Sequence, residues 1–281
     1  MAITYNPDND IPDLSGKAIA ANSLIDEVHA NTTTNDGNSI VTFIPCDQTS
    51  LSSVRDAAKL LLAKSQNLID ILICNAGVMA ILPALSQDAY EIQFAINHLA
   101  HAPLVQLCIP ALQNARAKND GAAGHGRIVV TVGGAWLGWG APEEVGGIDF
   151  TGLKKMQGGV GGPAMLAKYT LYSQSKLANV LHAAELARRY PELRRCYPSG
   201  GDCVDGADGA HEFHRPVGGE NGCEELRALQ FAGGQEKVSL ESGGLYEPVG
   251  KLLAHTELSA DEALAGKLWE WTEKEIEGYL Q

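Results

Sequence analysis

The stretch LIDILICNAG, residues 68–77, decides the fold class of this chain. It is a nearly continuous apolar run, rich in isoleucine and leucine, that ends in an Asn-Ala-Gly turn. Apolar runs of this length are typical of strands in parallel sheets whose two faces are both covered. We therefore expect a buried parallel strand here, with Asn75 at its carboxyl end.

Strand and helix patterns alternate on both sides of this run. Two further strands are expected at SIVTFIPCD (39–47) and GRIVVTV (126–132). Apolar residues at helical spacing predict helices over 50–65, 88–112, 168–190 and 264–280. The first of these begins at a serine cap, and the second is expected to break or kink at Pro103 and Pro110.

This alternation predicts an α/β fold: a Rossmann-like, doubly wound parallel sheet that forms a single domain over residues 1–281. Such sheets bind ligands at the carboxyl ends of their strands. Asp47, Asn75 and Gly133 fall at these ends.

Composition narrows the class of ligand. The net charge of −13, without a Lys/Arg cluster, argues against nucleic acid and anionic membranes as partners and favours small molecules. Residues 1–15 lack the apolar segment of a secretion signal, and no apolar run is long enough to span a bilayer, so we expect a cytoplasmic protein.

Six cysteines without a Cys-x-x-Cys pair predict reduced thiols rather than disulfides or zinc ligands. His211 and His214 lack the spacing of a helical zinc pair, so no metal site is expected.

The helix KYTLYSQSKLANVLHAAELARRY (168–190) contains the strongest chemical motif. Tyr172 and Lys176 are four residues apart and therefore share one helix face. The lysine ammonium can lower the pKa of the phenol from about 10 toward neutrality, which would make the tyrosine a general acid or base. A core tyrosine with a satisfied hydroxyl is the alternative, because a Tyr-x-x-x-Lys match by itself is weakly specific.

Four segments together resemble the short-chain dehydrogenase/reductase family in order and spacing. These are CNAG (74–77), Asn97 in the next helix, RIVVTVGGA (127–135) and YSQSKLANVL (172–181). The similarity extends to fungal members of the retinol-dehydrogenase branch, which belong to small-molecule secondary metabolism. It implies an oxidoreductase that uses NADP or NAD on a small lipophilic alcohol or ketone, and it is compatible with a homo-oligomer.

The resemblance also implies residue roles. Tyr172 would be the acid or base, Lys176 would in addition hydrogen-bond the nicotinamide ribose, and Asn97 would hold a water that links this lysine to solvent. Asn75 and Gly77 would border the cofactor, and Asp47 would accept a hydrogen bond from the adenine. The alternatives are ordinary strand-end turns for Asp47 and Asn75, and a solvent-facing helix position for Asn97.

The chain departs from the family pattern at two places that concern catalysis. Gly133 occupies the position of the family's serine, which donates a hydrogen bond to the substrate oxygen. Residues 16–38 lack the glycine-rich turn and the second strand of the first βαβ unit, although KAIAA (17–21) could be a remnant of the first strand. The helix expected over 20–28 follows directly. Both departures predict impaired cofactor binding and redox chemistry.

Residues 196–235 hold nine glycines and show neither strand nor helix periodicity. Shifting the reading frame by one nucleotide, with suitable synonymous codons, converts 196–206 into a family-like strand and Pro-Gly loop. We therefore expect this segment to be out of frame and irregular, in a degenerate copy or an erroneous gene sequence. The rival hypothesis is a cofactor-free relative that uses the scaffold for binding or for non-redox catalysis such as isomerisation or cyclisation.

Overall fold

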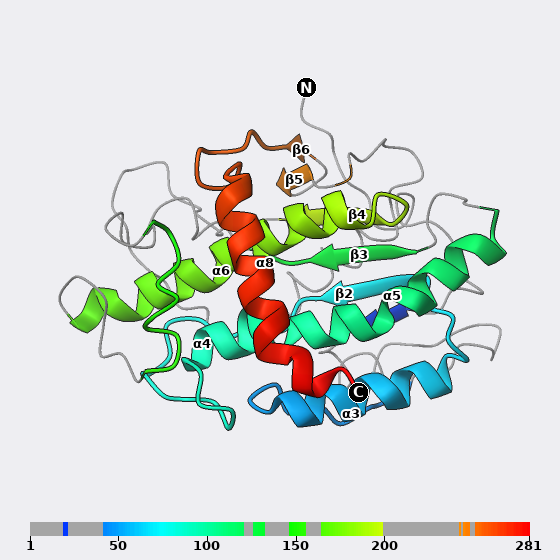
Figure 1. Ribbon diagram of the computed structural model, residues 1–281, viewed down its shortest axis with the longest axis horizontal. Helices are drawn as coiled ribbons and strands as arrows, with labels where there is room; N and C mark the ends of the chain where they lie inside the picture. Colours follow the sequence, from blue (N-terminus) through cyan, green and yellow to red (C-terminus); the bar gives the residue numbers. More distant parts are fainter. Residues whose placement is uncertain are drawn as a thin grey trace, which may run out of the picture.

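The computed structural model describes residues 19–21, 42–120, 126–132, 146–155, 164–198, 242, 244–247 and 251–281. Its described strands form one sheet in the order β1-β2-β3-β4-β5-β6 (Figure 1). The bounds are β1 Ile19–Ala21, β2 Ile71–Cys74, β3 Arg127–Val130, β4 Arg194–Pro198, β5 Gly244–Glu247 and β6 Lys251–Leu252. Neighbouring strands from β1 to β5 are parallel, and β6 is antiparallel to β5. The predicted Rossmann-like parallel sheet is confirmed.

The described helices pack as one layer with a further helix across it. The bounds are α3 Leu51–Lys64, α4 Ile92–Phe94, the π-helical η1 Ala95–Leu99, α5 His101–Lys118, α6 Ala164–Arg189, α8 Glu262–Ile276 and the 3₁₀ turn η4 Glu277–Tyr279. Helix α3 lies beside α5, α6 lies beside α4 and η1, and α8 crosses over α6 and α5 (Figure 1). The second helix layer of a doubly wound sheet is not among the residues that the structure describes.

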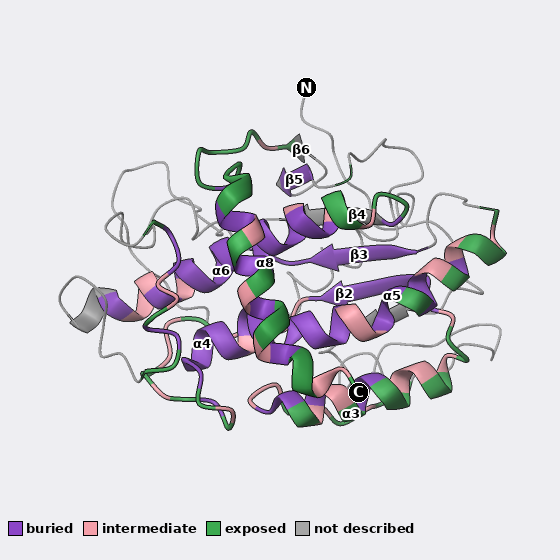
Figure 2. Ribbon diagram, in the orientation of Figure 1, coloured by how far each residue is buried: buried purple, intermediate pink, exposed green. Residues whose placement is uncertain are grey.

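The central strands are as buried as their apolar sequences predict. In β2, residues Ile71, Leu72 and Ile73 are each 1% exposed, and in β3 Ile128 and Val129 are fully buried (Figure 2). Helix α3 begins after Ser50, whose hydroxyl accepts from the Ser53 amide, as the predicted cap requires.

The long helix predicted over 88–112 is irregular, but not at the two prolines where a break or kink was expected. It runs through Pro103 and Pro110, and its irregular part is the π-helical turn η1, where the Ala100 amide donates to the Ala95 carbonyl at 2.8 Å. Pro110 itself is exposed, whereas Cys108 and Ala111 on the inner face of the same helix are fully buried. That packing offsets the hydrogen bond that proline cannot make.

The strand predicted over 39–47 is wrong for its described part, because residues 42–47 have no regular structure. Phe43, in the middle of this segment, is 60% exposed. A strand needs a neighbouring strand for its backbone groups, and the described residues place no strand beside 42–47.

The remnant of the first strand forms as a strand. Residues Ile19–Ala21 pair in parallel with Ile71–Ile73 of β2, so KAIAA contributes β1. The helix predicted over 20–28 is therefore wrong at 20 and 21, because pairing with β2 holds them extended, and the rest of it lies outside the described residues.

The segment 196–235 begins as a strand rather than as irregular chain. Residues Arg194–Pro198 form β4, which pairs with both β3 and β5. Two neighbouring strands supply hydrogen-bond partners for the backbone whatever the side chains are. The lack of apolar/polar alternation in the sequence therefore did not indicate an irregular chain. Residues 199–235 lie outside the described part of the chain.

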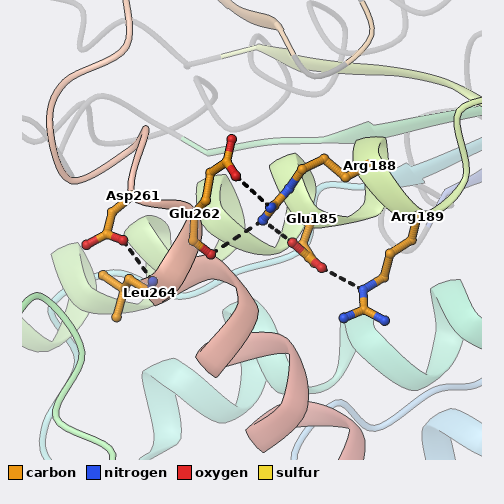
Figure 3. A network of polar contacts seen from close by, with 6 residues as sticks. All are labelled: Glu185, Arg188, Arg189, Asp261, Glu262 and Leu264. Atoms are coloured by element: carbon orange, nitrogen blue, oxygen red, sulfur yellow. Dashed lines mark hydrogen bonds and ion pairs between the residues drawn. The ribbon is translucent and has the colours of Figure 1, made fainter.

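Helix α8, which confirms the helix predicted near the end of the chain, is fixed to α6 by an ionic network (Figure 3). Glu185 accepts from Arg188 and, at 2.6 Å, from Arg189 Nε, while Arg188 Nη1 lies 3.2 Å from Glu262 Oε2. Asp261 caps α8 by accepting from the Leu264 amide at 2.9 Å. The start of α8 is thereby tied to the end of the helix that carries Tyr172.

Candidate active site

Three elements bring the predicted site residues together at the carboxyl end of β2. Asn75 and Gly77 follow β2 directly, Asn97 lies in η1, and Lys176 lies in α6. A Cβ built on Gly77 would lie 2.9 Å from Asn97 Oδ1 and 3.6 Å from Lys176 Nζ. The structure therefore gathers residues that are up to 101 positions apart in the sequence around one backbone position.

Asn97 is completely buried and clamps the loop after Gly77. Its Oδ1 accepts from the Val78 amide at 2.7 Å, and its Nδ2 donates to the Val78 carbonyl and to Ser175 Oγ, both at 2.9 Å. Both N–H groups of the side chain are thus used by protein groups. The solvent-facing alternative is wrong for Asn97, and the water-holding role stays a prediction.

Lys176 and Tyr172 lie together, as their four-residue spacing predicts. Lys176 is 5% exposed, and its Nζ lies 5.6 Å from the centroid of the Tyr172 ring. The same ammonium donates to the Thr131 carbonyl at 3.3 Å, so it is anchored at the carboxyl end of β3. The pair is thus positioned as a tyrosine tuned by a nearby ammonium requires, and the role of Tyr172 as general acid or base stays a prediction.

The end of β2 offers polar and open features that fit a nicotinamide cofactor. Asn75 Oδ1 is buried and has no hydrogen-bond partner in the described part of the chain. Gly77 is exposed and presents bare backbone beside Lys176. Asn75, Gly77, Tyr172 and Lys176 could therefore hold the nicotinamide half, whereas the sequence has no glycine-rich turn to hold the pyrophosphate.

Asp47 is an exposed residue in a turn at the start of α3. Its carboxylate accepts from the amide and hydroxyl of Thr49, at 2.9 and 2.8 Å, and from Gln87 Nε2 at 2.8 Å. The hydrogen bond from the Thr49 amide is the main cause that lowers the pKa of Asp47, followed by the Thr49 hydroxyl. The geometry is that of an ordinary turn before α3, and an adenine contact by Asp47 stays a prediction.

The position of the family's serine, Gly133, lies outside the described residues. Thr131, two residues earlier, is 6% exposed. Its hydroxyl has no hydrogen-bond partner among the described residues, while its carbonyl accepts a hydrogen bond from Lys176 Nζ.

Sequence reasoning missed several residues that build the site. Ser175 accepts from Asn97 and donates to the Tyr172 carbonyl at 2.7 Å, and Asn179 Nδ2 donates to the Asn97 carbonyl at 2.9 Å. Gln93 Oε1 accepts a hydrogen bond from the Ala80 amide at 2.8 Å, and Gln93 Nε2 donates one to the Lys168 carbonyl at 2.9 Å. The available signal was helical spacing, since 172, 175, 176 and 179 occupy one face of α6.

The fold and the site define a Rossmann-like α/β protein with a Tyr-Lys-Asn arrangement at the carboxyl end of its sheet. Comparison with known proteins agrees. The family described as short chain dehydrogenase matches residues 16–135. The short-chain dehydrogenase/reductase drtF of Aspergillus calidoustus is 31% identical over 93% of this chain and 82% of its own length. The chain belongs to the short-chain dehydrogenase/reductase family.

Two further matches are a curated relative and a solved structure. The polyprenol dehydrogenase of Mus musculus is 37% identical over 52% of this chain and 38% of its own length. The solved structure of the NADH-dependent reductase A1-R', complexed with NAD, superposes with a TM-score of 0.50 at 17% identity, covering 73% of this chain and 72% of that one. At that identity the structural match supports the fold alone.

Proposed function

We propose that this protein is an NAD(P)-dependent oxidoreductase that acts on a hydroxyl or carbonyl group of a small lipophilic molecule. The observation that carries the proposal is the convergence of Tyr172, Lys176 and Asn97 around the bare backbone of Gly77. The family assignment supports the reaction class. The choice between NAD and NADP is left to measurement.

In this reaction the protein's own residues handle the proton. In ketone reduction Tyr172 donates its phenolic proton to the substrate oxygen, and in alcohol oxidation it takes that proton back. Lys176 stabilises the phenolate that forms, because its ammonium lies beside the tyrosine ring. A bound nicotinamide would supply or accept the hydride. Asn97 keeps the loop at Gly77 and Val78 in place.

The loop after Gly77 supports a lipophilic substrate. Met79, Leu82 and Leu85 are 55%, 85% and 40% exposed, and residues 78–86 contain no charged side chain. Exposed apolar residues grouped beside a polar site are typical of surfaces that bind apolar ligands. The polyprenol dehydrogenase relative is consistent with such a substrate.

We expect the reaction to be weak in this chain. No glycine-rich turn exists between Gly16 and Asn38 to bind the pyrophosphate, and Gly133 cannot donate to the substrate oxygen. Losing one such donor typically lowers the rate by about two to three orders of magnitude.

The homo-oligomeric state and the cytoplasmic location are part of the same proposal. No described helix is long and apolar enough to cross a membrane.

The test combines titration with turnover. Calorimetric titration with NADPH and NADH is expected to show binding weaker than the low micromolar range, and excess NADPH should drive slow reduction of lipophilic ketones. Tyr172→Phe should remove most of that turnover, by about 10²- to 10⁴-fold, with little effect on cofactor affinity. Gly133→Ser should raise turnover by about 10²-fold. Equal turnover with phenylalanine at 172 would make Tyr172 a core tyrosine and refute the proposal.

The missing glycine turn favours a second candidate, a cofactor-free binding protein or non-redox catalyst. In that case lipophilic ligands should bind with the same affinity with or without NADPH. Turnover of ketones should then stay undetectable at any cofactor concentration, in the chain and in Gly133→Ser alike.

A further inference from the structure

A buried chain of hydrogen bonds leads from helix α8 to the candidate active site. Thr272 Oγ1 lies 3.2 Å from His98 Nε2, and His98 Nδ1 lies 3.3 Å from Asn179 Oδ1. Asn179 Nδ2 then donates to the Asn97 carbonyl at 2.9 Å. Thr272, His98 and Asn179 are 0%, 2% and 3% exposed, so water does not compete for these bonds.

The donor directions in this chain follow from its end at Asn97. A backbone carbonyl can only accept, so the amide nitrogen of Asn179 faces Asn97 and its oxygen faces His98. His98 must therefore carry its proton on Nδ1, which leaves Nε2 to accept from the Thr272 hydroxyl. Burial lowers the pKa of His98 to about 4, which agrees with a neutral ring.

The chain ends at an unusual piece of backbone. Asn97 lies in the π-helical turn η1, a form that is rare and often found at functional sites. This turn directs the Asn97 side chain onto both backbone groups of Val78, next to Gly77 and Lys176. A π-helical turn can relax to ordinary α-helix unless its surroundings hold it.

We propose that Asn179, His98 and Thr272 are positioning residues that hold the π-helical turn, and thereby Asn97 and the Val78 backbone, in the geometry that the reaction needs. Helix α8 is then part of the active-site support rather than only a cover for α5 and α6. The effect on turnover rests on the proposed oxidoreductase function, whereas the effect on the Val78 backbone does not.

Hydrogen exchange at the Val78 amide tests the structural step directly, because this amide donates to Asn97 Oδ1. Thr272→Val keeps the shape and removes the hydroxyl, and Asn179→Leu removes the donor to Asn97. Each is expected to speed Val78 exchange at least tenfold relative to core amides such as Val129 in β3. Nitrogen chemical shifts should show His98 protonated on Nδ1 in the unmodified protein and a changed tautomer population in Thr272→Val.

Two matched variants separate positioning from general loosening. Thr272→Ser retains the hydroxyl and should restore normal Val78 exchange. Leu268→Ala, one turn earlier on α8 and fully buried in the native protein, should speed exchange throughout the core without a selective change at Val78. Unchanged Val78 exchange in both Thr272→Val and Asn179→Leu would overturn the proposal, and Thr272→Val suffices if Asn179→Leu does not fold.

Turnover provides the catalytic readout. In the ketone-reduction assay, Thr272→Val is expected to lower kcat about tenfold and leave KM within twofold, because misplacing a support costs rate more than binding. Selective loss at Val78 with unchanged kcat would overturn the catalytic part. Exchange needs neither cofactor nor turnover, so a failure of the oxidoreductase function would be recognised separately.

Discussion

At the scale of single residues, Gly77 is the position at which the site has no spare room. A side chain there would press on Asn97 Oδ1, the atom that accepts from Val78. Atoms rarely approach a Cβ as closely as 2.9 Å, so Asn97 would have to move. The hydrogen bonds from Asn97 to Val78 and the open space beside Lys176 therefore both require that residue 77 has no side chain.

Gly77→Ala is expected to weaken the protein and its site together. Displacing Asn97 should cost about 1–3 kcal/mol in the free energy of unfolding, measured by urea titration. The Val78 amide should at the same time lose its protection from hydrogen exchange.

The matched control for this substitution is Gly266→Ala in the middle of α8, where a Cβ would meet nothing within 4 Å. It should stabilise the protein by about 0.5–1 kcal/mol, because alanine favours helix over glycine. Equal effects of the two substitutions would contradict the crowding argument at Gly77.

At the scale of elements, the end of α8 is fastened to the loop before α4. Tyr90 donates to Glu275 Oε2 at 2.5 Å, and Tyr279 donates to Asp88 Oδ1 at 2.8 Å. Asp88 Oδ2 accepts from the Leu51 amide at 2.7 Å, which links the same contact to the first turn of α3. One helix thus fixes the ends of two others.

Glu275→Ala should destabilise this junction by about 1–3 kcal/mol, because the nearly buried Tyr90 hydroxyl would lose its acceptor. Tyr90→Phe in the same background should add little, and a double-mutant cycle measures that coupling. Lys154 also contacts Glu275, but its side chain is 55% exposed, so Lys154→Met should cost less than about 1 kcal/mol. A larger effect of Lys154→Met than of Glu275→Ala would contradict this ranking.

At the scale of the whole molecule, three histidines are buried between η1, α5, α6 and α8. His98 packs edge-on against His182 at 5.2 Å, and His182 stacks on Trp269 at 4.8 Å. Burial lowers the pKa of His101 to about 3, with further contributions from Lys176 and His98. Burial also lowers the pKa of His182 well below its usual value, with smaller contributions from His98, His101 and Arg189. Folding therefore requires all three rings to be neutral.

The stability of the protein should fall as the pH drops below the ordinary histidine pKa of about 6.5. In that range the unfolded chain binds protons that the folded protein excludes, so acid favours unfolding. Each buried histidine contributes at most about 1.4 kcal/mol per pH unit, down to its folded pKa. Urea unfolding between pH 7.5 and 5.5 should show this slope.

His182→Phe, which preserves the stacking on Trp269, should reduce the slope by about one third. His255→Gln, at an exposed position outside this cluster, is the control for replacing a histidine. A slope that is the same in His182→Phe and in the unmodified protein would show that His182 binds protons in the folded protein just as it does in the unfolded chain.

The sequence by itself determined the order of the elements and the pairing of Tyr172 with Lys176. Both are local properties: short continuous apolar runs such as 68–77 are typical of buried strands, and a four-residue spacing places two side chains on one helix face. The family resemblance added Asn97 and Gly77 as members of the site, and the structure brought both next to Lys176.

Only the tertiary structure decided which segments found partners. Residues 42–47 resemble a strand but pair with no strand among the described residues, whereas 196–198 lack strand periodicity and belong to β4, which pairs with β3 and β5. The contacts of Asn179 and His98 with Asn97 and Thr272 likewise join residues 82 and 174 positions apart. Backbone pairing and buried hydrogen bonds depend on what packs alongside, and that is a property of the folded chain rather than of any local pattern.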